Sequence, residues 1–472
     1  MRATAQLAKV RSPGLTGSSW YTWSDDGFVG RVLKIGLQAS LFLSLFDLPV
    51  RYVIGSRVAG GVALFAIQLL LFLFVVMIAL ISKPLRFMRY DVIVALFLLY
   101  GVFHAALPLG WGERPLFVSR ELRTYFFDFL LYFVVRYYLQ RTRNFAMLYR
   151  WLRLIVLIAC TEYLYELIGI LVLGVPAEVL IPWISVLEEV SDVEWVDKGQ
   201  WYFPTLFAKS HAVGMLATVG VVLFYARYKL ARRRWNLVAM VFCFFVVLAV
   251  ASRMFVAALM VVTLGLVLGE REGLGRRLLV IAVVLMVAIA IVGVAAGLMD
   301  DVRAFLELYW ENMTSQTSAF FEFRDEYVNF VPTLNGGIGE NVFYYLFGTG
   351  ANELFEQVEP LRLPIASYGY HGIEIRLFGV VLQYGLLYLL LWAGLATLTV
   401  ELAADWRLRI YGWALIPFFA SMIHYLEVFK VTIFPTFLVL YAALATASET
   451  GSEGFIVSDD DSAENNCRDV VR

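Results

Sequence analysis

A histidine, a glutamate and an arginine lie within six positions of one another in the stretch SYGYHGIEIRLFG, residues 367–379. These residues are His371, Glu374 and Arg376, and they stand where a long polar segment gives way to a hydrophobic run. Imidazole is the side chain best suited to accept a proton near neutral pH, so His371 is a candidate general base. A lone loop histidine more often makes a structural hydrogen bond, and for His371 this alternative stays open.

Two arginines are candidate anion ligands. Arg253 lies between two apolar runs in AVASRMFVAAL, and Arg324 lies in the acidic stretch FEFRDEYVNF. A guanidinium presents a rigid fork of N–H donors that suits phosphate oxygens. The alternative for Arg253 is a side chain that reaches from a helix end to the membrane surface, and for Arg324 it is a loop salt bridge.

The other histidines and the cysteines offer weaker signals. Lys209 and His211, in FAKSHAVGM, stand at the start of an apolar run and are candidate ligands, with a polar contact between helices as the alternative. His104 and His424 lie inside apolar runs, where we expect structural hydrogen bonds. No cluster of histidines or cysteines has the spacing of metal ligands or of a disulfide framework, so neither is predicted.

The composition places these residues in a membrane protein. Hydrophobic residues make up 61% of the chain and charged residues 16%, and the mean hydropathy is +0.74. A bilayer core takes about 20 apolar residues per helical span. Twelve runs come near this length: 33–50, 58–82, 91–109, 121–139, 150–174, 209–226, 235–250, 253–269, 278–298, 376–398, 410–427 and 430–447. We therefore predict an all-α polytopic membrane protein with about twelve transmembrane helices.

The distribution of positive charge predicts the orientation of these helices. About two thirds of the 38 lysine and arginine residues fall in the two termini and in alternate loops, most densely in ARRRW at 231–235. Because such loops stay in the cytoplasm, both termini are predicted to be cytoplasmic. No removable signal peptide is evident before residue 31.

Four parts follow from this topology. Residues 1–298 would hold the first nine transmembrane helices, and residues 376–447 the last three. Between them, residues 299–375 form one large, mostly helical loop outside the cytoplasm, with twelve acidic residues and three arginines. The tail, 448–472, is acidic and poor in aromatic residues, so we expect it to be disordered.

The order of these features resembles the superfamily of bacterial O-antigen polymerases and O-antigen ligases. Members have about a dozen spans, a short turn with an arginine between two central helices, and one large periplasmic loop. The matching elements lie within about residues 200–400, in the order Ser252-Arg253, Arg324, Gly348-Thr349-Gly350 with Phe355, and His371. The family often has asparagine after the histidine, where this chain has Gly372.

The resemblance implies a fold similar to that of lipid-linked glycosyltransferases of the GT-C class. It also implies glycan transfer from undecaprenyl pyrophosphate on the periplasmic side of the bacterial inner membrane, with inversion and without a metal or other cofactor. Arg253 and Arg324 would bind the pyrophosphate, and His371 would act on the acceptor hydroxyl as base.

Four further residues and several partners complete the prediction. Lys209 and His211 would contribute to substrate binding, Glu374 would bind a sugar hydroxyl, and Arg376 would anchor the chain or contact substrate at the membrane interface. The expected partners are the lipid-linked glycan, membrane lipid, and polysaccharide assembly proteins such as a chain-length regulator or a flippase. No nucleic acid partner is expected.

We predict a polymerase of a cell-surface polysaccharide, and three alternatives stay open. A ligase would move the finished glycan to lipid A core or another acceptor. A transporter or flippase would use carboxylates within the spans, for which Asp128, Glu162 and Glu166 are candidates. A non-catalytic member of a polysaccharide export complex is the third alternative.

Overall fold

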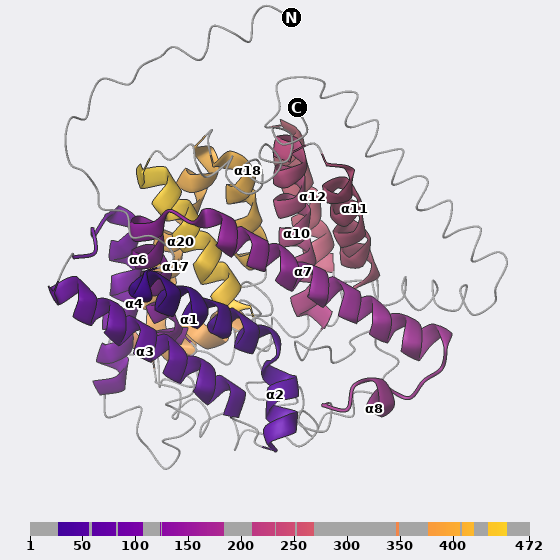
Figure 1. Ribbon diagram of the computed structural model, residues 1–472, viewed down its shortest axis with the longest axis horizontal. Helices are drawn as coiled ribbons and strands as arrows, with labels where there is room; N and C mark the ends of the chain where they lie inside the picture. Colours follow the sequence, from indigo (N-terminus) through magenta and orange to yellow (C-terminus); the bar gives the residue numbers. More distant parts are fainter. Residues whose placement is uncertain are drawn as a thin grey trace, which may run out of the picture.

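The protein, seen in a computed structural model, is built from α-helices (Figure 1). The structure describes residues 27–55, 59–81, 84–106, 123, 125–183, 210–231, 233–250, 253–268, 346–348, 376–405, 408–419 and 433–450. No strand occurs among these residues. The described part therefore confirms the prediction of an all-α protein.

The helices follow one another along the chain with short connections in the first half. They are α1 (Phe28–Leu45), α2 (Asp47–Ile54), α3 (Ala59–Ile81), α4 (Arg89–Ala106), α6 (Leu130–Thr142), α7 (Phe145–Leu167), α8 (Ala177–Leu180), α10 (Ser210–Ala231), α11 (Arg234–Ala249), α12 (Arg253–Leu268), α17 (Arg376–Ala404), α18 (Arg409–Gly412) and α20 (Phe434–Thr450). Short helical turns add η3 (Phe127–Phe129), η4 (Ile168–Val172) and η6 (Trp413–Leu415).

Five of the described helical segments are long and apolar enough to cross a membrane: Phe28–Leu45, Val62–Ile81, Arg89–Ala106, Ala212–Lys229 and Tyr384–Ala404. Shorter apolar helices, including α11 and α20, accompany them. These segments indicate a membrane protein. The total of twelve spans, the orientation and the large outer loop stay predictions, because 278–298 and nearly all of 299–375 lie outside the described residues.

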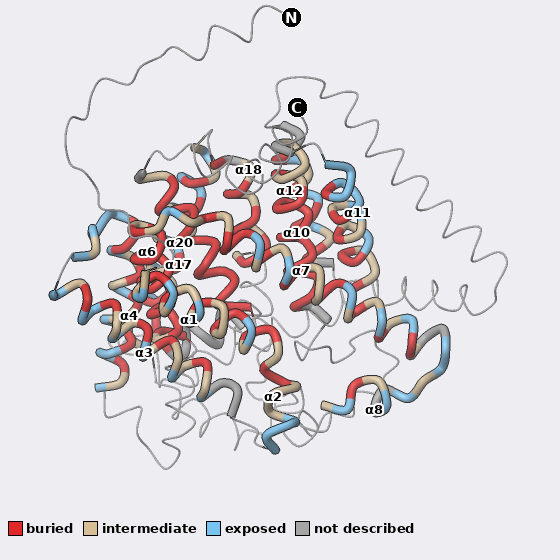
Figure 2. The backbone as a smooth tube through the Cα atoms, viewed as in Figure 1, coloured by how far each residue is buried: buried red, intermediate tan, exposed pale blue. Residues whose placement is uncertain are grey.

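The outer helices present large apolar side chains to their surroundings, as the exposed positions on α3 in Figure 2 illustrate. On α3, Leu70 is 66% exposed and Leu80 is 82% exposed. On α11, Val238 is 55% exposed. A row of such side chains is unfavourable in water but suits contact with lipid chains. The exposure pattern therefore agrees with helices that lie at the surface of a membrane-embedded bundle.

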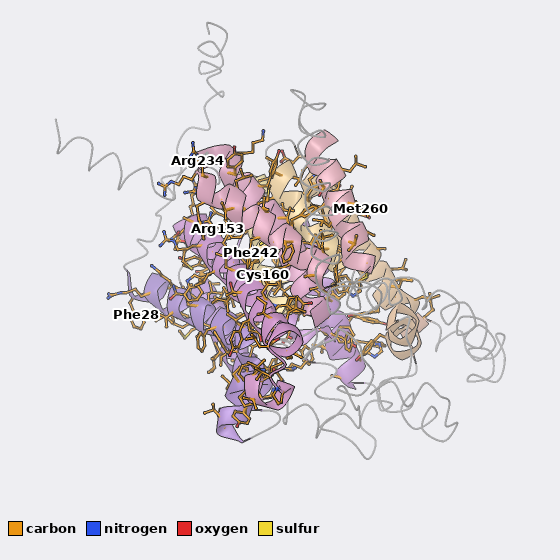
Figure 3. All side chains as sticks on the ribbon, turned by 90° about the vertical axis from the view of Figure 1, so that its right-hand side faces the viewer. Phe28, Arg153, Cys160, Arg234, Phe242 and Met260 are labelled. Atoms are coloured by element: carbon orange, nitrogen blue, oxygen red, sulfur yellow. The ribbon has the colours of Figure 1, made fainter. Side chains whose placement is uncertain are left out.

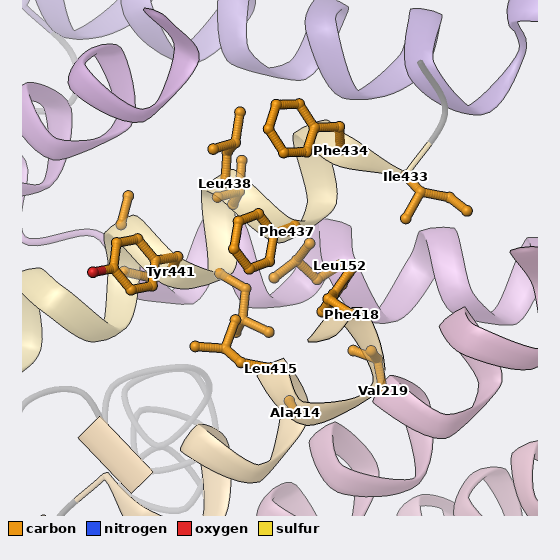
Figure 4. Packing of buried hydrophobic residues seen from close by; sticks show 14 of the residues in the cluster. Leu152, Val219, Ala414, Leu415, Phe418, Ile433, Phe434, Phe437, Leu438 and Tyr441 are labelled. Atoms are coloured by element: carbon orange, nitrogen blue, oxygen red, sulfur yellow. The ribbon is translucent and has the colours of Figure 1, made fainter. Parts of the chain in front are cut away.

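Helix α20 occupies the centre of the bundle. Every residue from 433 to 447 is buried, so this helix is enclosed on all sides. It packs against α1, α6, α7 and α17. Figure 4 shows Phe434, Phe437 and Tyr441 of α20 among side chains from α7 and from the segment around η6. The position of α20 therefore determines where its neighbours lie.

Helices α7 and α10 approach each other closely through a glycine. A Cβ atom at Gly220 of α10 would lie 2.4 Å from Cγ1 of Val156 on α7, and 2.8 Å from Sγ of Cys243 on α11. Such contacts require a residue without a side chain. The glycine thus defines the level at which α7, α10 and α11 meet.

Basic residues gather at one end of the bundle. Figure 3 shows Phe28 and Arg234, from the starts of α1 and α11, and Arg153, from the first half of α7, along one side of the molecule. The Nη2 group of Arg141, near the end of α6, donates to the carbonyl of Pro84 at 3.0 Å. We call this the basic end; the charge bias of the sequence predicts that it faces the cytoplasm.

A buried ionic network joins three helices near the basic end. Arg136 of α6 is fully buried, and its Nε donates to Oδ1 of Asp91 on α4 at 2.8 Å. Its Nη1 donates to Oγ1 of Thr446 on α20 at 2.8 Å, and its Nη2 bonds Glu449 of the same helix. The Tyr132 hydroxyl also donates to Asp91 at 2.8 Å. The network therefore links α4 and α6 to the central helix.

We expect Arg136→Met to destabilise the protein strongly. The change removes the positive partner that the network provides for the buried carboxylate of Asp91, and breaking such a pair costs about 3–5 kcal/mol. The free energy of unfolding of the detergent-solubilised protein, measured by denaturant titration, tests this expectation.

Arg89→Ala is the matched control. Arg89 pairs with Glu401 at 3.0 Å, but their side chains are 63% and 44% exposed. Exposed pairs contribute about 0–1 kcal/mol, so this change should have a small effect. Equal losses of stability in the two variants would show that the buried network stabilises the fold no more than an exposed ion pair does.

Candidate functional site

The predicted site residues fall into two groups in the structure. Lys209, Arg324, His371 and Glu374 lie outside the described residues. The other three stand at helix starts: Ser210 and then His211 begin α10, Arg253 begins α12, and Arg376 begins α17. The side chains of these three residues are outside the described part. The predicted convergence of Arg253, Arg324 and His371 therefore stays a prediction.

The starts of α10 and α12 lie against each other. A Cβ atom at Gly214, in the second turn of α10, would lie 3.0 Å from the ring of Phe255 and 3.1 Å from Cγ1 of Val250. Phe255 is two residues beyond the first residue of α12, and Val250 directly follows the last residue of α11. Two predicted site positions, His211 and Arg253, thus each stand within about one turn of this contact.

The end of α7 adjoins the same place. The Tyr163 hydroxyl of α7 donates to the carbonyl of Ala249, the last residue of α11, at 3.0 Å. Further back on α7, Val156 lies opposite Gly220 of α10. We call this region the helix junction: the end of α7, the starts of α10 and α12, and the end of α11.

A buried carboxyl group lies in the helix junction. Glu166 continues the buried stripe of α7 that includes Cys160 and Tyr163, and it is 1% exposed. Glu162, one turn earlier, is close enough for the two carboxyl groups to interact. The end of α7 therefore carries a pair of neighbouring carboxyl groups, of which that of Glu166 is buried.

The electrostatics of the junction favour an anion at the helix starts. A helix carries partial positive charge at its N-terminus, where its first N–H groups have no partner within the helix. Helices α10 and α12 have 22 and 16 residues and begin side by side. Phosphate groups commonly bind at such positions.

A second region of interest is the contact between α17 and residues 346–348, which lead into the glycine element of the sequence. Gly385 interrupts α17 with φ 76° and ψ 176°. A Cβ atom there would lie 2.2 Å from the carbonyl oxygen of Leu346. The Tyr100 hydroxyl of α4 donates to the carbonyl of Tyr384 at 2.7 Å and lies 3.4 Å from that of Leu346. We call this contact of residues 346–348 with α4 and α17 the glycine clamp.

His104 of α4 completes the glycine clamp. Its imidazole makes a hydrogen bond with the backbone of Phe347, and the side chain is 4% exposed. The Nε2 atom has no partner in the part of the chain that the structure describes. The Phe103 ring also lies 5.1 Å from that of Phe347, centroid to centroid. The structural hydrogen bond expected for His104 is therefore present, and its partner belongs to the glycine element.

One further carboxyl group is buried within the bundle. Asp128 in η3 is fully buried, and neither of its carboxyl oxygens has a hydrogen-bond partner among the described residues, although Arg123 attracts it electrostatically. The sequence singled out Asp128, Glu162 and Glu166 only as residues that a transporter would need. The burial of Asp128 and Glu166 depends on how the helices pack, and the order of apolar residues along the chain does not reveal it.

The described residues contain no group of three or more histidine, cysteine, aspartate or glutamate side chains that could hold a metal ion. The two carboxyl groups in the helix junction and the imidazole in the glycine clamp are the polar groups that distinguish those two places.

Comparisons with protein-family models, with curated proteins and with solved structures found no match to this chain.

We expect Gly385→Ala to disrupt the glycine clamp. Alanine is strained at φ 76°, ψ 176°, and its methyl group would meet a backbone carbonyl that cannot rotate away. The variant should show a lower melting temperature and faster hydrogen–deuterium exchange around residues 346–348.

Gly55→Ala is the control variant that separates the effect of backbone strain from the effect of the steric clash. Gly55 also has a positive φ, 68°, but no atom of the described residues lies within 4 Å of the place that an added Cβ atom would take. Its replacement should cost about 1–2 kcal/mol and leave exchange around residues 346–348 unchanged. If both variants altered this exchange equally, the clamp would not be the cause.

Proposed function

We propose that the protein is a polymerase of a cell-surface polysaccharide in the bacterial inner membrane. It would transfer glycan from undecaprenyl pyrophosphate to an acceptor sugar hydroxyl on the periplasmic side. The observation that carries the proposal is the helix junction, where α12 begins with Arg253 beside the start of α10 with His211. This arrangement suits a phosphate-bearing ligand.

The chemistry of the donor explains why such a site would promote transfer. As the bond between the anomeric carbon and the pyrophosphate oxygen breaks, negative charge grows on the leaving pyrophosphate. Donors held in place for that charge stabilise the transition state more than the bound substrate. Arg253 and Arg324 would supply these donors, with Lys209, His211 and the two helix starts beside them.

The acceptor would be handled by the segment around His371. Its imidazole takes the proton of the acceptor hydroxyl as the oxygen attacks the anomeric carbon, and undecaprenyl pyrophosphate leaves from the opposite face. A single displacement of this kind inverts the anomeric configuration. Glu374 would accept a hydrogen bond from a sugar hydroxyl, and Arg376, the first residue of α17, would lie at the membrane interface.

The glycine clamp gives independent support to the proposal. The resemblance groups the element Gly348-Thr349-Gly350 with the segment that contains His371 and leads into α17. Residues 346–348 lie against Gly385 of α17, nine residues after its start at Arg376. The segment that leads into the glycine element thus lies against the helix that follows the proposed base.

We expect Arg253→Ala, Arg324→Ala and His371→Ala each to lower the rate of chain growth by about 100-fold or more. The assay uses purified protein with a defined undecaprenyl-pyrophosphate oligosaccharide and follows product length by gel. Arg89→Ala, an exposed arginine at the basic end, is the control that should retain full activity. Normal chain growth in all three well-folded variants would refute the catalytic assignment.

A ligase is the nearest alternative, and a deletion strain distinguishes it. Loss of a polymerase leaves single repeat units on the cell surface, because transfer to the final acceptor continues. Loss of a ligase leaves long chains on the lipid carrier. The same purified assay with lipid A core as acceptor gives a second discrimination.

A transporter is the second candidate function, and the buried carboxyl group of Asp128 favours it. A carboxyl group without a hydrogen-bond partner, in the described part of a membrane bundle, is typical of proton pathways. Under this alternative, Asp128→Asn would abolish a proton flux through proteoliposomes, detected with an enclosed pH-sensitive dye. Under the polymerase proposal, the wild-type protein produces no such flux.

A further inference from the structure

In the glycine clamp, two polar side chains of α4 bind the backbone of distant residues. The Tyr100 hydroxyl donates to the carbonyl of Tyr384 at 2.7 Å and lies 3.4 Å from that of Leu346, 246 positions later in the chain. The imidazole of His104 makes a hydrogen bond with the backbone of Phe347. Polar side chains within a membrane helix are costly, so such positions are candidates for a functional role.

The imidazole of His104 is held in one orientation. Its Nε2 atom has no partner in the part of the chain that the structure describes, so we assign the bond to Nδ1, which donates to the carbonyl oxygen of Phe347. The rings of Tyr100, Phe126 and Tyr384 surround the imidazole, with centroids 4.7, 5.9 and 5.4 Å from its own. A donor enclosed by packed rings keeps its direction.

The clamped backbone leads directly into the glycine element. Gly348, the last of the clamped residues, has a positive φ of 79°, a conformation that glycine adopts readily. On the other side of the contact, Gly385 lies nine residues after Arg376, the first residue of α17. His371 lies between Gly348 and Arg376 in the sequence. The clamp therefore joins the chain segment that precedes His371 to the helix that follows it.

A general base acts only over a short distance. It must lie within hydrogen-bond reach of the hydroxyl that it deprotonates, and a displacement of about 1 Å lowers the rate by about 100-fold. A residue between helices keeps such a position best when the chain on both sides of it is held by rigid elements. Helix α4 is such an element, because it packs against both α6 and α17.

We propose that His104 is a positioning residue for glycan transfer, whose Nδ1–H group fixes the carbonyl of Phe347 and with it the chain that leads to His371. This inference rests on the proposed function and adds to it a residue of α4, outside the segments that carry the resemblance. In this role His104 does not touch the substrate. It acts on the rate of transfer through the backbone, and the affinity for the lipid-linked donor does not depend on it.

His104→Phe and His104→Asn test the role of the Nδ1–H group. Phenylalanine keeps a ring among the aromatic side chains but has no donor, whereas asparagine can place an N–H group close to the position of Nδ1. We expect the phenylalanine variant to extend chains about tenfold more slowly at saturating donor, with unchanged affinity for undecaprenyl-pyrophosphate oligosaccharide. Its hydrogen–deuterium exchange around residues 346–348 should be faster. The asparagine variant should restore most of the rate and the slow exchange.

Tyr100→Phe tests the same clamp through a second side chain. It removes only the hydroxyl group near the carbonyls of Tyr384 and Leu346, so it should change rate and exchange in the same direction as His104→Phe. Val102→Ala is the matched control on the same helix, because Val102 is 58% exposed, and it should behave as the wild type does. Gel analysis of chain growth gives the rates, and fluorescence titration of a labelled donor in nanodiscs gives the affinities.

The possible outcomes separate the inference from the proposed function. If the wild type neither binds the donor nor extends chains, the proposed function is wrong and the positioning role falls with it. If the wild type is active and His104→Phe matches its rate, the function stands and the inference is wrong. Equal losses of rate in His104→Asn and His104→Phe would show that the Nδ1–H group is not the cause. A lower melting temperature in His104→Phe, with rate and affinity reduced together, would show a general structural role, which also overturns the inference.

Discussion

The ionic network of Arg136 is the constraint on which the rest of the bundle depends. A charge that is fully removed from water needs both opposite charges and hydrogen bonds, and Arg136 finds them on two other helices. Such a group accepts only one arrangement of its partners. Sliding α20 by a single residue would separate Thr446 from the guanidinium. Apolar side chains that pack between helices impose no comparably strict preference for one register.

Through α20, this constraint also limits the positions of the helices that pack around it. Because α20 is enclosed on all sides, the helices around it have little freedom to shift. Among them, α7 is held at one level against α10 by the glycine contact at Gly220. Further along α7, the Tyr163 hydroxyl donates to the carbonyl of Ala249 at the end of α11. The helix junction is therefore a consequence of packing far from it along the chain.

The two candidate regions differ in how they are built. In the helix junction, the carboxyl groups of Glu162 and Glu166 lie close together, and that of Glu166 is buried. In the glycine clamp, Tyr100 and His104 hold the backbone of residues 346–348 through hydrogen bonds, and Gly385 makes room for it. The first arrangement suits the binding of a ligand, whereas the second suits the positioning of a loop.

The sequence by itself determined that this is an all-helical membrane protein, because hydrophobic runs of bilayer length leave few other folds. It also placed several helix starts correctly, since Arg253 and His211 mark changes from polar to apolar sequence. Only the tertiary structure decided that these two starts lie together, that Glu166 is buried, and that residues 346–348 contact Gly385. These facts depend on helix register and on contacts between distant residues, and local hydrophobicity contains no information about either.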